Sequence, residues 1–322
     1  MTMRFPAILL ALAAIAFGPA QAAGDGKKGK EKPGKKSEHC ELSIIHPGAV
    51  DVSASSPYDA FSPSPSVVRA PLQIRAKGPA CAFAIGFASA NDRGGDRRLA
   101  YRNSRLSYWA SPDRSGTVKL GDATQDFGGR LLRGEFRGGE TVIDLPYFLF
   151  VPGGQPAAAA GRYDDRLSIT LYRLDGKSLR RADSADIQIR LSVEPAIEAT
   201  VISDAGAGPL ASGTHLLRLG DLTRGARRDF QLAIRANTEY RLRLESEHRG
   251  ALRHKSLGAR AEIPYALAID GAPAPLGRPF ELESRRIRFD RIRKTLTVTA
   301  GPAESALAGE YSDNLKITII AR

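Results

Sequence analysis

The sequence predicts an all-β protein built from two tandem antiparallel β-sandwiches, and three observations lead to this expectation. Hydrophobic and polar side chains alternate along many short segments, turn-forming residues separate those segments, and one stretch of the chain recurs near the end. The 322 residues are enough for about two domains of ordinary size. A content of 42% hydrophobic and 25% charged residues is typical of globular proteins and excludes a largely disordered chain.

The first 22 residues have the pattern of a secretory signal peptide. Arg4 precedes an apolar run from Phe5 to Phe17, and the small residues Ala20 and Ala22 form a cleavage site. We therefore expect an exported mature chain that begins at Ala23. No later apolar run is long enough to predict a transmembrane segment after cleavage.

Residues 23–38 are rich in lysine and glycine and contain no large apolar side chain. Such a segment has nothing to bury, so we expect a disordered basic tether. The whole chain carries 47 basic and 35 acidic residues, a formal net charge of +12. Because this excess is spread thinly over the chain, it does not predict a nucleic-acid partner.

The two cysteines, Cys40 and Cys81, lie early in the first predicted domain. In an exported protein two cysteines allow one intramolecular disulfide, which we expect here. A pair of free, buried thiols is the alternative.

Strands are predicted wherever apolar residues recur at every second position. Asp175-Gly176 and Asp270-Gly271 follow such segments and suit the tight turns of hairpins. No long amphipathic helix is evident. The predicted strands contain, in order, Ile187 to Val193, Phe230 to Ile234, Tyr240 to Leu244, Leu267 with Ile269, Ile287 with Phe289, Leu296 with Val298, and Leu315 to Ile319.

An internal repeat gives the domain organisation. Residues 160–171, AGRYDDRLSITL, return as residues 308–319, AGEYSDNLKITI, with seven of twelve positions identical at a separation of 148. A repeat at this distance indicates two similar domains that end in equivalent strands. We expect a first sandwich over residues 39–190 and a second over residues 191–322.

The chain resembles the spore coat U family of secreted pilin-like domains, which includes subunits of archaic chaperone-usher fimbriae. The first domain carries this resemblance through Cys40, Tyr58-Asp59 with Phe61, Cys81, Arg98-Leu99, Leu106 with Tyr108, and the ending at residues 160–165. The second domain resembles a related pilin-like module through residues 219–222, Gly225, Asn237 with Tyr240, Ser246-Glu247, residues 250–252, residues 263–265 and the repeated ending.

The resemblance implies an immunoglobulin-like sandwich that lacks one strand and accepts it from elsewhere. The implied partners are a periplasmic chaperone, an outer-membrane usher and another fimbrial subunit, on the way through the periplasm to the cell surface or a fimbrium. Leu315, Ile317 and Ile319 are then the strand-accepting edge, because the sequence ends at Arg322 directly after them. Polymerising pilins begin with a donor strand of alternating apolar residues, and residues 23–38 have no such pattern, which favours a tip adhesin with a surface receptor.

The segment Ile187 to Val193 is ambiguous at this level. It completes the first sandwich, which is our slight preference, or it opens the second.

Tyr163 and Tyr311 occupy the same place in the two repeats and are expected to be structural corner residues. Tyr101, Tyr108 and Trp109 lie in an arginine-rich stretch and are candidate ligand contacts, with an ordinary core Trp109 as the alternative. The five histidines show no metal-ligand spacing, and no nucleophile motif or catalytic carboxylate pair stands out, so we expect no enzyme, metal or cofactor. The alternative function is a free-standing periplasmic or secreted binding module for a polysaccharide or protein.

Overall fold

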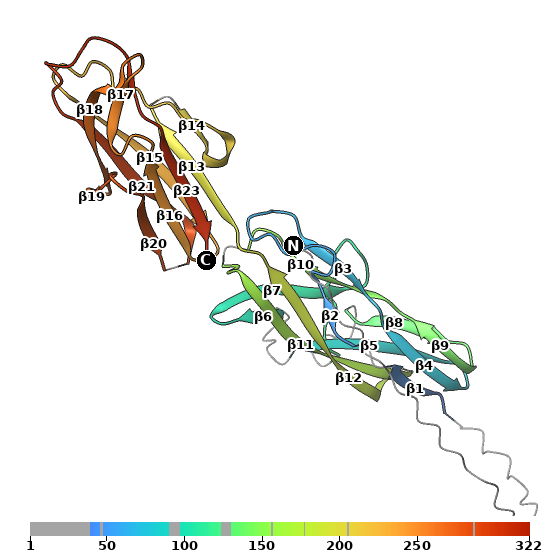
Figure 1. Ribbon diagram of the computed structural model, residues 1–322. Coiled ribbons are helices and arrows are strands. Elements are labelled where there is room, and N and C mark those ends of the chain that lie inside the picture. Colours follow the sequence, from blue (N-terminus) through green and yellow to red (C-terminus); the bar gives the residue numbers. More distant parts are fainter. Residues whose placement is uncertain are drawn as a thin grey trace, which may run out of the picture. The chain divides into compact units, whose positions relative to one another are not determined.

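A computed structural model describes residues 39–45, 48–89, 97–123, 130–155, 157–176, 178–204, 206–285 and 287–322 (Figure 1). The predicted signal peptide (residues 1–22) and tether (residues 23–38) lie outside these described residues. Across the described ranges the secondary structure is almost entirely β, with one short 3-10 turn, η1 (Leu210–Ser212), and no α-helix. No helix there is long and apolar enough to cross a membrane.

Among the described residues, the first sandwich contains twelve strands. They are β1 (Glu41–Ile45), β2 (Val50–Asp51), β3 (Ser66–Ala70), β4 (Gln73–Gly78), β5 (Cys81–Ser89), β6 (Arg97–Tyr101), β7 (Ser104–Ser111), β8 (Leu132–Phe136), β9 (Gly139–Asp144), β10 (Tyr147–Val151), β11 (Gly161–Asp175) and β12 (Ser178–Val193). One sheet has the order β1-β4-β9, and the larger sheet has the order β2-β12-β11-β6-β7-β10-β3, with β5 pairing both β11 and β8.

The second sandwich contains the remaining strands. They are β13 (Ile197–Ser203), β14 (Gly206–Pro209), β15 (Ala226–Ala236), β16 (Tyr240–Ser246), β17 (Ala251–His254), β18 (Gly258–Ile269), β19 (Ala272–Ala274), β20 (Phe280–Ser284), β21 (Arg288–Ala300), β22 (Tyr311–Ser312) and β23 (Leu315–Ala321). The larger sheet has the order β14-β13-β15-β21-β18-β17-β22, with β19 on β18, and the smaller one has the order β20-β16-β23.

The all-β prediction is confirmed, and both predicted hairpin turns are present. Asp175 pairs with Ser178 at the β11–β12 turn, and Ile269 pairs with Ala272 across Asp270-Gly271. Asp270 and Gly271 have φ values of 49° and 82°, the left-handed backbone that a tight hairpin needs and that glycine adopts without strain. Ile287 is an exception among the predicted strand residues, because it precedes β21 and is 37% exposed.

The boundary between the sandwiches differs from the expected position. β12 pairs with β11 as far as Val193, so a division after residue 190 cuts a strand of the first sandwich. The second sandwich begins with β13 at Ile197. The residues between the two sandwiches are therefore Glu194, Pro195 and Ala196.

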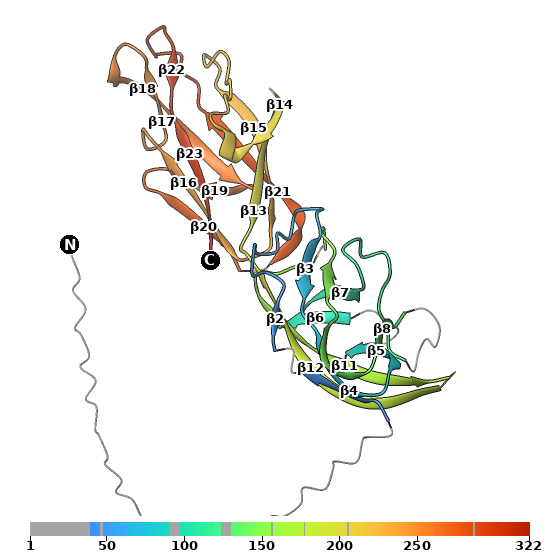
Figure 2. The ribbon, with the colours of Figure 1, turned by 90° about the vertical axis from the view of Figure 1, so that its right-hand side faces the viewer.

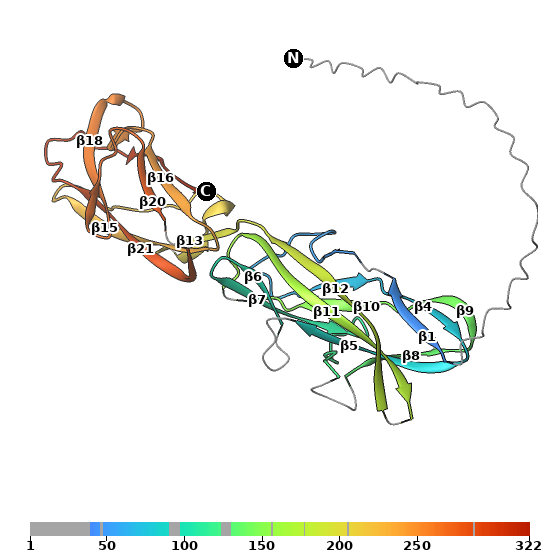
Figure 3. The ribbon, with the colours of Figure 1, turned by 90° about the horizontal axis from the view of Figure 1, so that it is seen from below.

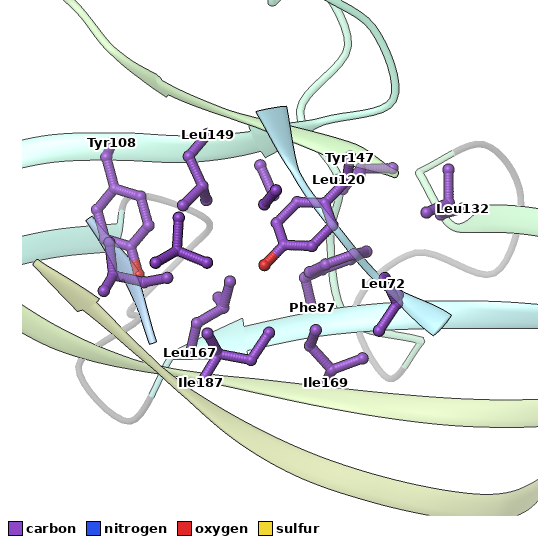
Figure 4. Close-up of a cluster of buried hydrophobic side chains, with 14 of the residues drawn as sticks. Leu72, Phe87, Tyr108, Leu120, Leu132, Tyr147, Leu149, Leu167, Ile169 and Ile187 are labelled. Atoms are coloured by element: carbon purple, nitrogen blue, oxygen red, sulfur yellow. The ribbon is translucent and has the colours of Figure 1, made fainter. Parts of the chain in front are cut away.

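Each sandwich has its own hydrophobic core, as two packed sheets require. In the first core Ile187 of β12 lies beside Leu167 and Ile169 of β11 (Figure 4). The second core is formed mainly by β15, β16, β18 and β21, with Leu232, Leu242 and Leu296 among its buried residues.

Candidate strand-binding site

The repeated strand of the first sandwich, β11, has partners along both of its edges. It pairs antiparallel with β12 from Gly161↔Val193 to Asp175↔Ser178, so that the two strands run side by side (Figure 3). Its other edge pairs with β5 and, at Asp164, with β6. β12 is therefore the strand that completes this side of the first sandwich.

β12 is bound on its far side as well. Ile189 and Arg190 pair in parallel with Val50 and Asp51 of β2, and the backbone N–H of Tyr58 donates to the Ser192 carbonyl at 2.9 Å. Strand edges that are paired on both sides leave no row of free backbone groups. The ambiguous segment Ile187 to Val193 thus belongs to the first sandwich and completes it in cis.

Burial follows from this pairing. Ile187, Ile189 and Leu191 are 0% exposed, and so are Leu167, Ile169 and Leu171 on β11. Burying a branched aliphatic side chain contributes about 1.5–3 kcal/mol relative to leaving it in water. The inward face of β12 is therefore a large part of what holds the first sandwich together.

The equivalent strand of the second sandwich, β23, has a partner along one edge. It pairs with β16 from Ser246↔Leu315 to Tyr240↔Ala321 (Figure 2), and it ends the sheet order β20-β16-β23. No strand among the described residues pairs with its other side. We call that side the open edge of β23.

The predicted strand-accepting residues lie on this strand and face the core. Leu315, Ile317 and Ile319 are packed against the second core but are only partly buried. Other partly buried apolar residues on this core come from the segment before β15; they are Ile197, Ala199, Leu210, Leu217 and Leu219. An unpaired edge beside incompletely covered aliphatic side chains is the geometry that an added strand satisfies.

The missing neighbour also changes the strand itself. β11 is continuous over fifteen residues, whereas the matching stretch of the second sandwich is divided into β22 and β23 by Asp313 and Asn314. In the first sandwich the positions matching this break, Asp165 and Arg166, are paired with Ile189 and Gln188 of β12. The interruption therefore lies where the second sandwich lacks the equivalent of β12.

A buried carboxylate recurs at this strand in both sandwiches. Asp165 accepts hydrogen bonds from Ser89 Oγ at 2.8 Å and from the Tyr108 hydroxyl at 2.7 Å. Asp313 accepts from Ser246 Oγ and from the Tyr265 hydroxyl, both at 2.6 Å. Buried charges are tolerated when they are hydrogen-bonded in this way.

The environment of the two tyrosines raises their pKa values. Burial raises the pKa of Tyr108 far above its usual range, and the nearby negative charge of Asp165 adds to the effect. Burial also raises the pKa of Tyr265, together with its hydrogen bond to Asp313. Both hydroxyls therefore remain protonated donors over the physiological pH range.

These two aspartates do not stand out as functional residues in the sequence. Asp165 is 5% exposed, and the Asp313 side chain is 3% exposed. The signal was present in the repeat, since both copies keep an aspartate two residues after the tyrosine. The serine and tyrosine partners come from other strands, and the repeat does not reveal them.

The two repeat tyrosines bond back to the chain four residues upstream. The Tyr163 hydroxyl donates to the Ala159 carbonyl at 2.9 Å and lies 2.6 Å from Ser104 Oγ, and the side chain is fully buried. The Tyr311 hydroxyl donates to the Leu307 carbonyl at 2.8 Å, but its ring is only partly buried. This is the hydrogen bond expected of a corner tyrosine, and the contribution of each residue to stability stays a prediction.

The predicted disulfide is confirmed. Cys40, directly before β1, is bonded to Cys81 at the start of β5, with an S–S distance of 2.05 Å. It closes a loop over a sequence separation of 41 residues in the first sandwich. The sequence contains two cysteines, so the second sandwich is formed without one.

The three candidate ligand contacts have different positions. Tyr108 is 1% exposed and bonded to Asp165, so its side chain offers no surface to a ligand, and that prediction is wrong. Tyr101 packs 5.5 Å from the Tyr163 ring. Trp109 stacks on Phe150 at 4.5 Å, with Lys119 Nζ 4.5 Å from its ring centroid. A ligand contact at Tyr101 or Trp109 stays a prediction.

The structure places no group of three or more His, Cys, Asp or Glu side chains together in a way that suits a metal ion, within the residues it describes. The candidate site is a strand edge with an apolar face, which is a geometry suited to β-strand addition.

No protein-family profile matches the chain, and no curated protein matches it in sequence. The likeness to the spore coat U family accordingly stays a prediction.

Several solved structures are similar to the chain. One is the CsuC–CsuE chaperone–tip adhesion subunit complex of the archaic Csu pili of Acinetobacter baumannii, with 12% identity, coverage of 87% of this chain and 99% of that one, and a TM-score of 0.41. The CupB6 tip adhesin of Pseudomonas aeruginosa has 12% identity, coverage of 87% and 92%, and a TM-score of 0.37. The CssB subunit of enterotoxigenic Escherichia coli, complemented with a donor strand from CssA, has 17% identity, coverage of 48% and 97%, and a TM-score of 0.27. Similarities this low do not establish a function for this chain.

Proposed function

We propose that the chain is an exported fimbrial or cell-surface structural subunit, a two-domain tip adhesin whose second sandwich accepts a β-strand from a chaperone or from the next subunit. The observation that supports this most is the open edge of β23, where Leu315, Ile317 and Ile319 are partly exposed. The proposal rests on the strand pairing of the chain itself.

The open edge gives the second sandwich a reason to bind a partner. An unpaired strand edge presents free N–H and C=O groups and is a template for pairing with another chain. An added strand with apolar residues at alternate positions satisfies those groups and covers the aliphatic side chains at the same time. The second sandwich is therefore expected to be only marginally stable until a partner supplies this strand.

The first sandwich has the opposite character. β12 completes it in cis, and the Cys40–Cys81 disulfide crosslinks it. A subunit with one complete domain and one strand-accepting domain suits the end of a fibre, where the complete domain is free to contact a surface receptor. The composition of residues 23–38, with no alternating apolar residues to donate, agrees with this position.

The partners follow from this role. A periplasmic chaperone would protect the open edge after export, an outer-membrane usher would exchange it for the strand of another subunit, and the subunit would then lie at the cell surface. An enzymatic role is not proposed, because the buried carboxylates Asp165 and Asp313 are occupied by serine and tyrosine hydroxyls.

Expression of the exported chain, alone and together with a chaperone encoded beside it, tests the proposal. Alone, the second sandwich should be cut rapidly by protease or aggregate while the first survives. With the chaperone, the chain should be recovered as a protease-resistant complex. A monomer that is equally resistant without help would favour the free-standing binding module instead.

A further inference from the structure

The first sandwich holds, in cis, a strand in the position that the second sandwich leaves empty. We propose that β12 is a template for the partner of β23: the second sandwich takes, antiparallel, a strand that repeats the pattern and register of Ser184–Val193. This inference rests on the proposed strand-accepting function and specifies the chemistry of the strand that is accepted.

The repeat supplies the register. Positions 161–171 of β11 correspond to positions 309–319, so each residue of β12 can be assigned an equivalent neighbour on the second sandwich. Ile187 pairs with Leu167, which corresponds to Leu315, and Ala185 pairs with Ile169, which corresponds to Ile317. The accepted strand should therefore place a large aliphatic residue opposite Leu315 and a small one opposite Ile317.

The same register extends the accepting edge beyond the residues predicted from the sequence. Ile189, Leu191 and Val193 pair with Asp165, Tyr163 and Gly161. The equivalents of these three partners are Asp313, Tyr311 and Gly309. The accepted strand should thus run past the break between β22 and β23 and make that stretch continuous, as β12 does for β11.

Gly161 of the first sandwich and Gly309 of the second, which lie at the start of the two repeated stretches, have similar surroundings. A Cβ atom added at Gly161 would lie 2.3 Å from the Tyr101 ring, and one added at Gly309 would lie 2.0 Å from His254 Nε2. Their φ values of 152° and 155° are nearly the same. The side chain that lies over each glycine also packs against the repeat tyrosine, Tyr101 against Tyr163 and His254 against Tyr311. At this glycine the backbone of the second sandwich therefore has the same conformation as the β12-paired backbone of the first.

The outward face of the pairing specifies one charge. In the first sandwich Asp186 lies opposite Ser168 and accepts a hydrogen bond from its hydroxyl at 2.6 Å. The residue that corresponds to Ser168 is the exposed Lys316. A carboxylate at the position of Asp186 would therefore face an ammonium group across the new strand pair, which is favourable for cross-strand neighbours.

A labelled synthetic peptide that copies Ser184–Val193 tests this register by fluorescence anisotropy with the full exported chain. The peptide should bind, and the substitution Ile189→Asp in the peptide should weaken binding by about 100-fold or more, because it places a carboxylate in the core. The matched peptide substitution Gln188→Asp, on the outward face, should change affinity by less than about threefold.

A charge exchange locates the peptide on β23. Replacing Asp186 by Lys in the peptide should weaken binding a few-fold at low salt, and the chain variant Lys316→Asp should restore it. Both variants leave the core untouched, so a loss of folding does not obscure the result. If Lys316→Asp does not restore the binding of the Asp186→Lys peptide, the peptide binds in another register or at another site. That result would overturn the inference.

A second peptide of the same length, alternating valine and threonine, separates this inference from the proposed function. If it binds while the β12 copy does not, or if the β12 copy is insensitive to Ile189→Asp, the second sandwich accepts strands but β12 is not their template. If neither peptide binds, the inference and the strand-accepting function are both contradicted.

Discussion

β11 and β23 belong to a repeat with seven of twelve identical positions, but their surroundings differ. β11 is paired on both edges and its inward residues Leu167, Ile169 and Leu171 are fully buried. β23 is paired with β16 on one edge, and its inward residues are only partly buried. Whether such a strand belongs to a complete sandwich is decided by the next segment along the chain and not by the strand itself.

This difference assigns a separate role to each domain. The first sandwich carries its last strand and a disulfide within the same polypeptide, so it is expected to keep its fold alone. The second sandwich has the same buried Ser–Asp–Tyr arrangement, with Asp313 in the place of Asp165, but in the proposed function it takes its last strand from outside. The following predictions test this division.

The largest effect is expected from damage to β12. Ile189→Asp should destabilise the first sandwich by about 4 kcal/mol or more, because it buries an unpaired carboxylate at a fully covered position. Limited proteolysis of the exported chain should then cut the first sandwich as readily as the second. Gln188→Asp, on the exposed face of the same strand, serves as the control, and equal resistance of both variants would contradict the role of β12.

Removal of the disulfide should have the next largest effect, and on the first sandwich alone. A crosslink that closes a loop of this length, with a sequence separation of 41, contributes about 4 kcal/mol in the chain-entropy account. The double variant Cys40→Ser with Cys81→Ser should lower the melting temperature of the first sandwich in calorimetry. A lower melting temperature of the second sandwich in this variant would show that the two domains do not unfold separately.

A matched pair of truncations compares the repeated strands directly. Leu167→Ala should cost about 2–5 kcal/mol, because the side chain is fully buried. Leu315→Ala, at the equivalent partly buried position, should cost about 1 kcal/mol in the free chain. Denaturant titrations of each domain, monitored by proteolysis, would measure both. The cost of Leu315→Ala should rise when a strand is bound, and equal costs in the free chain would contradict the open edge.

High pH should destabilise both sandwiches, and the first more strongly. The raised pKa values of Tyr108 and Tyr265 mean that each tyrosine stays neutral when folded but ionises above about pH 10 when unfolded. The stabilisation that each neutral tyrosine gives to the folded state is fully present below that pH, and it is lost as the pH rises toward the folded-state pKa. For Tyr108 the loss approaches about 1.4 kcal/mol per pH unit, whereas the partly exposed Tyr265 loses less because solvent screens it.

Unfolding free energies measured between pH 9 and 11 would test this dependence. Tyr108→Phe should flatten the alkaline slope of the first sandwich, and Tyr265→Phe should flatten that of the second. A slope that persists in both variants would assign the alkaline loss to other groups.

Much of the fold could be predicted from the sequence because alternation has a local cause. Residues on one face of a strand recur at every second position, and this located β15, β16 and β23. The turns at Asp175-Gly176 and Asp270-Gly271 were predictable for the same local reason. The repeat at a separation of 148 predicts from the sequence alone that β11 and β23 are equivalent strands.

What the sequence could not supply depends on contacts between distant segments. The alternation of Ile187, Ile189 and Leu191 is the same whether the segment closes the first sandwich or opens the second, so its partner had to come from the structure. Tyr108 lies in an arginine-rich stretch, which is typical of ligand contacts. Its hydrogen bond to Asp165 depends on where β7 lies relative to β11, and the local sequence does not reveal this. Ile287 alternates like a strand residue and yet lies outside β21.

Hydrogen exchange of the β11 and β23 backbone amides in the free, monomeric chain tests the central claim most directly. Amides of β11 should be protected at both edges, whereas the amides of β23 that do not donate to β16 should exchange rapidly and become protected when a strand is added. If those β23 amides are already protected as strongly as their β11 equivalents, then the chain closes its own second sandwich and the strand-accepting account is wrong.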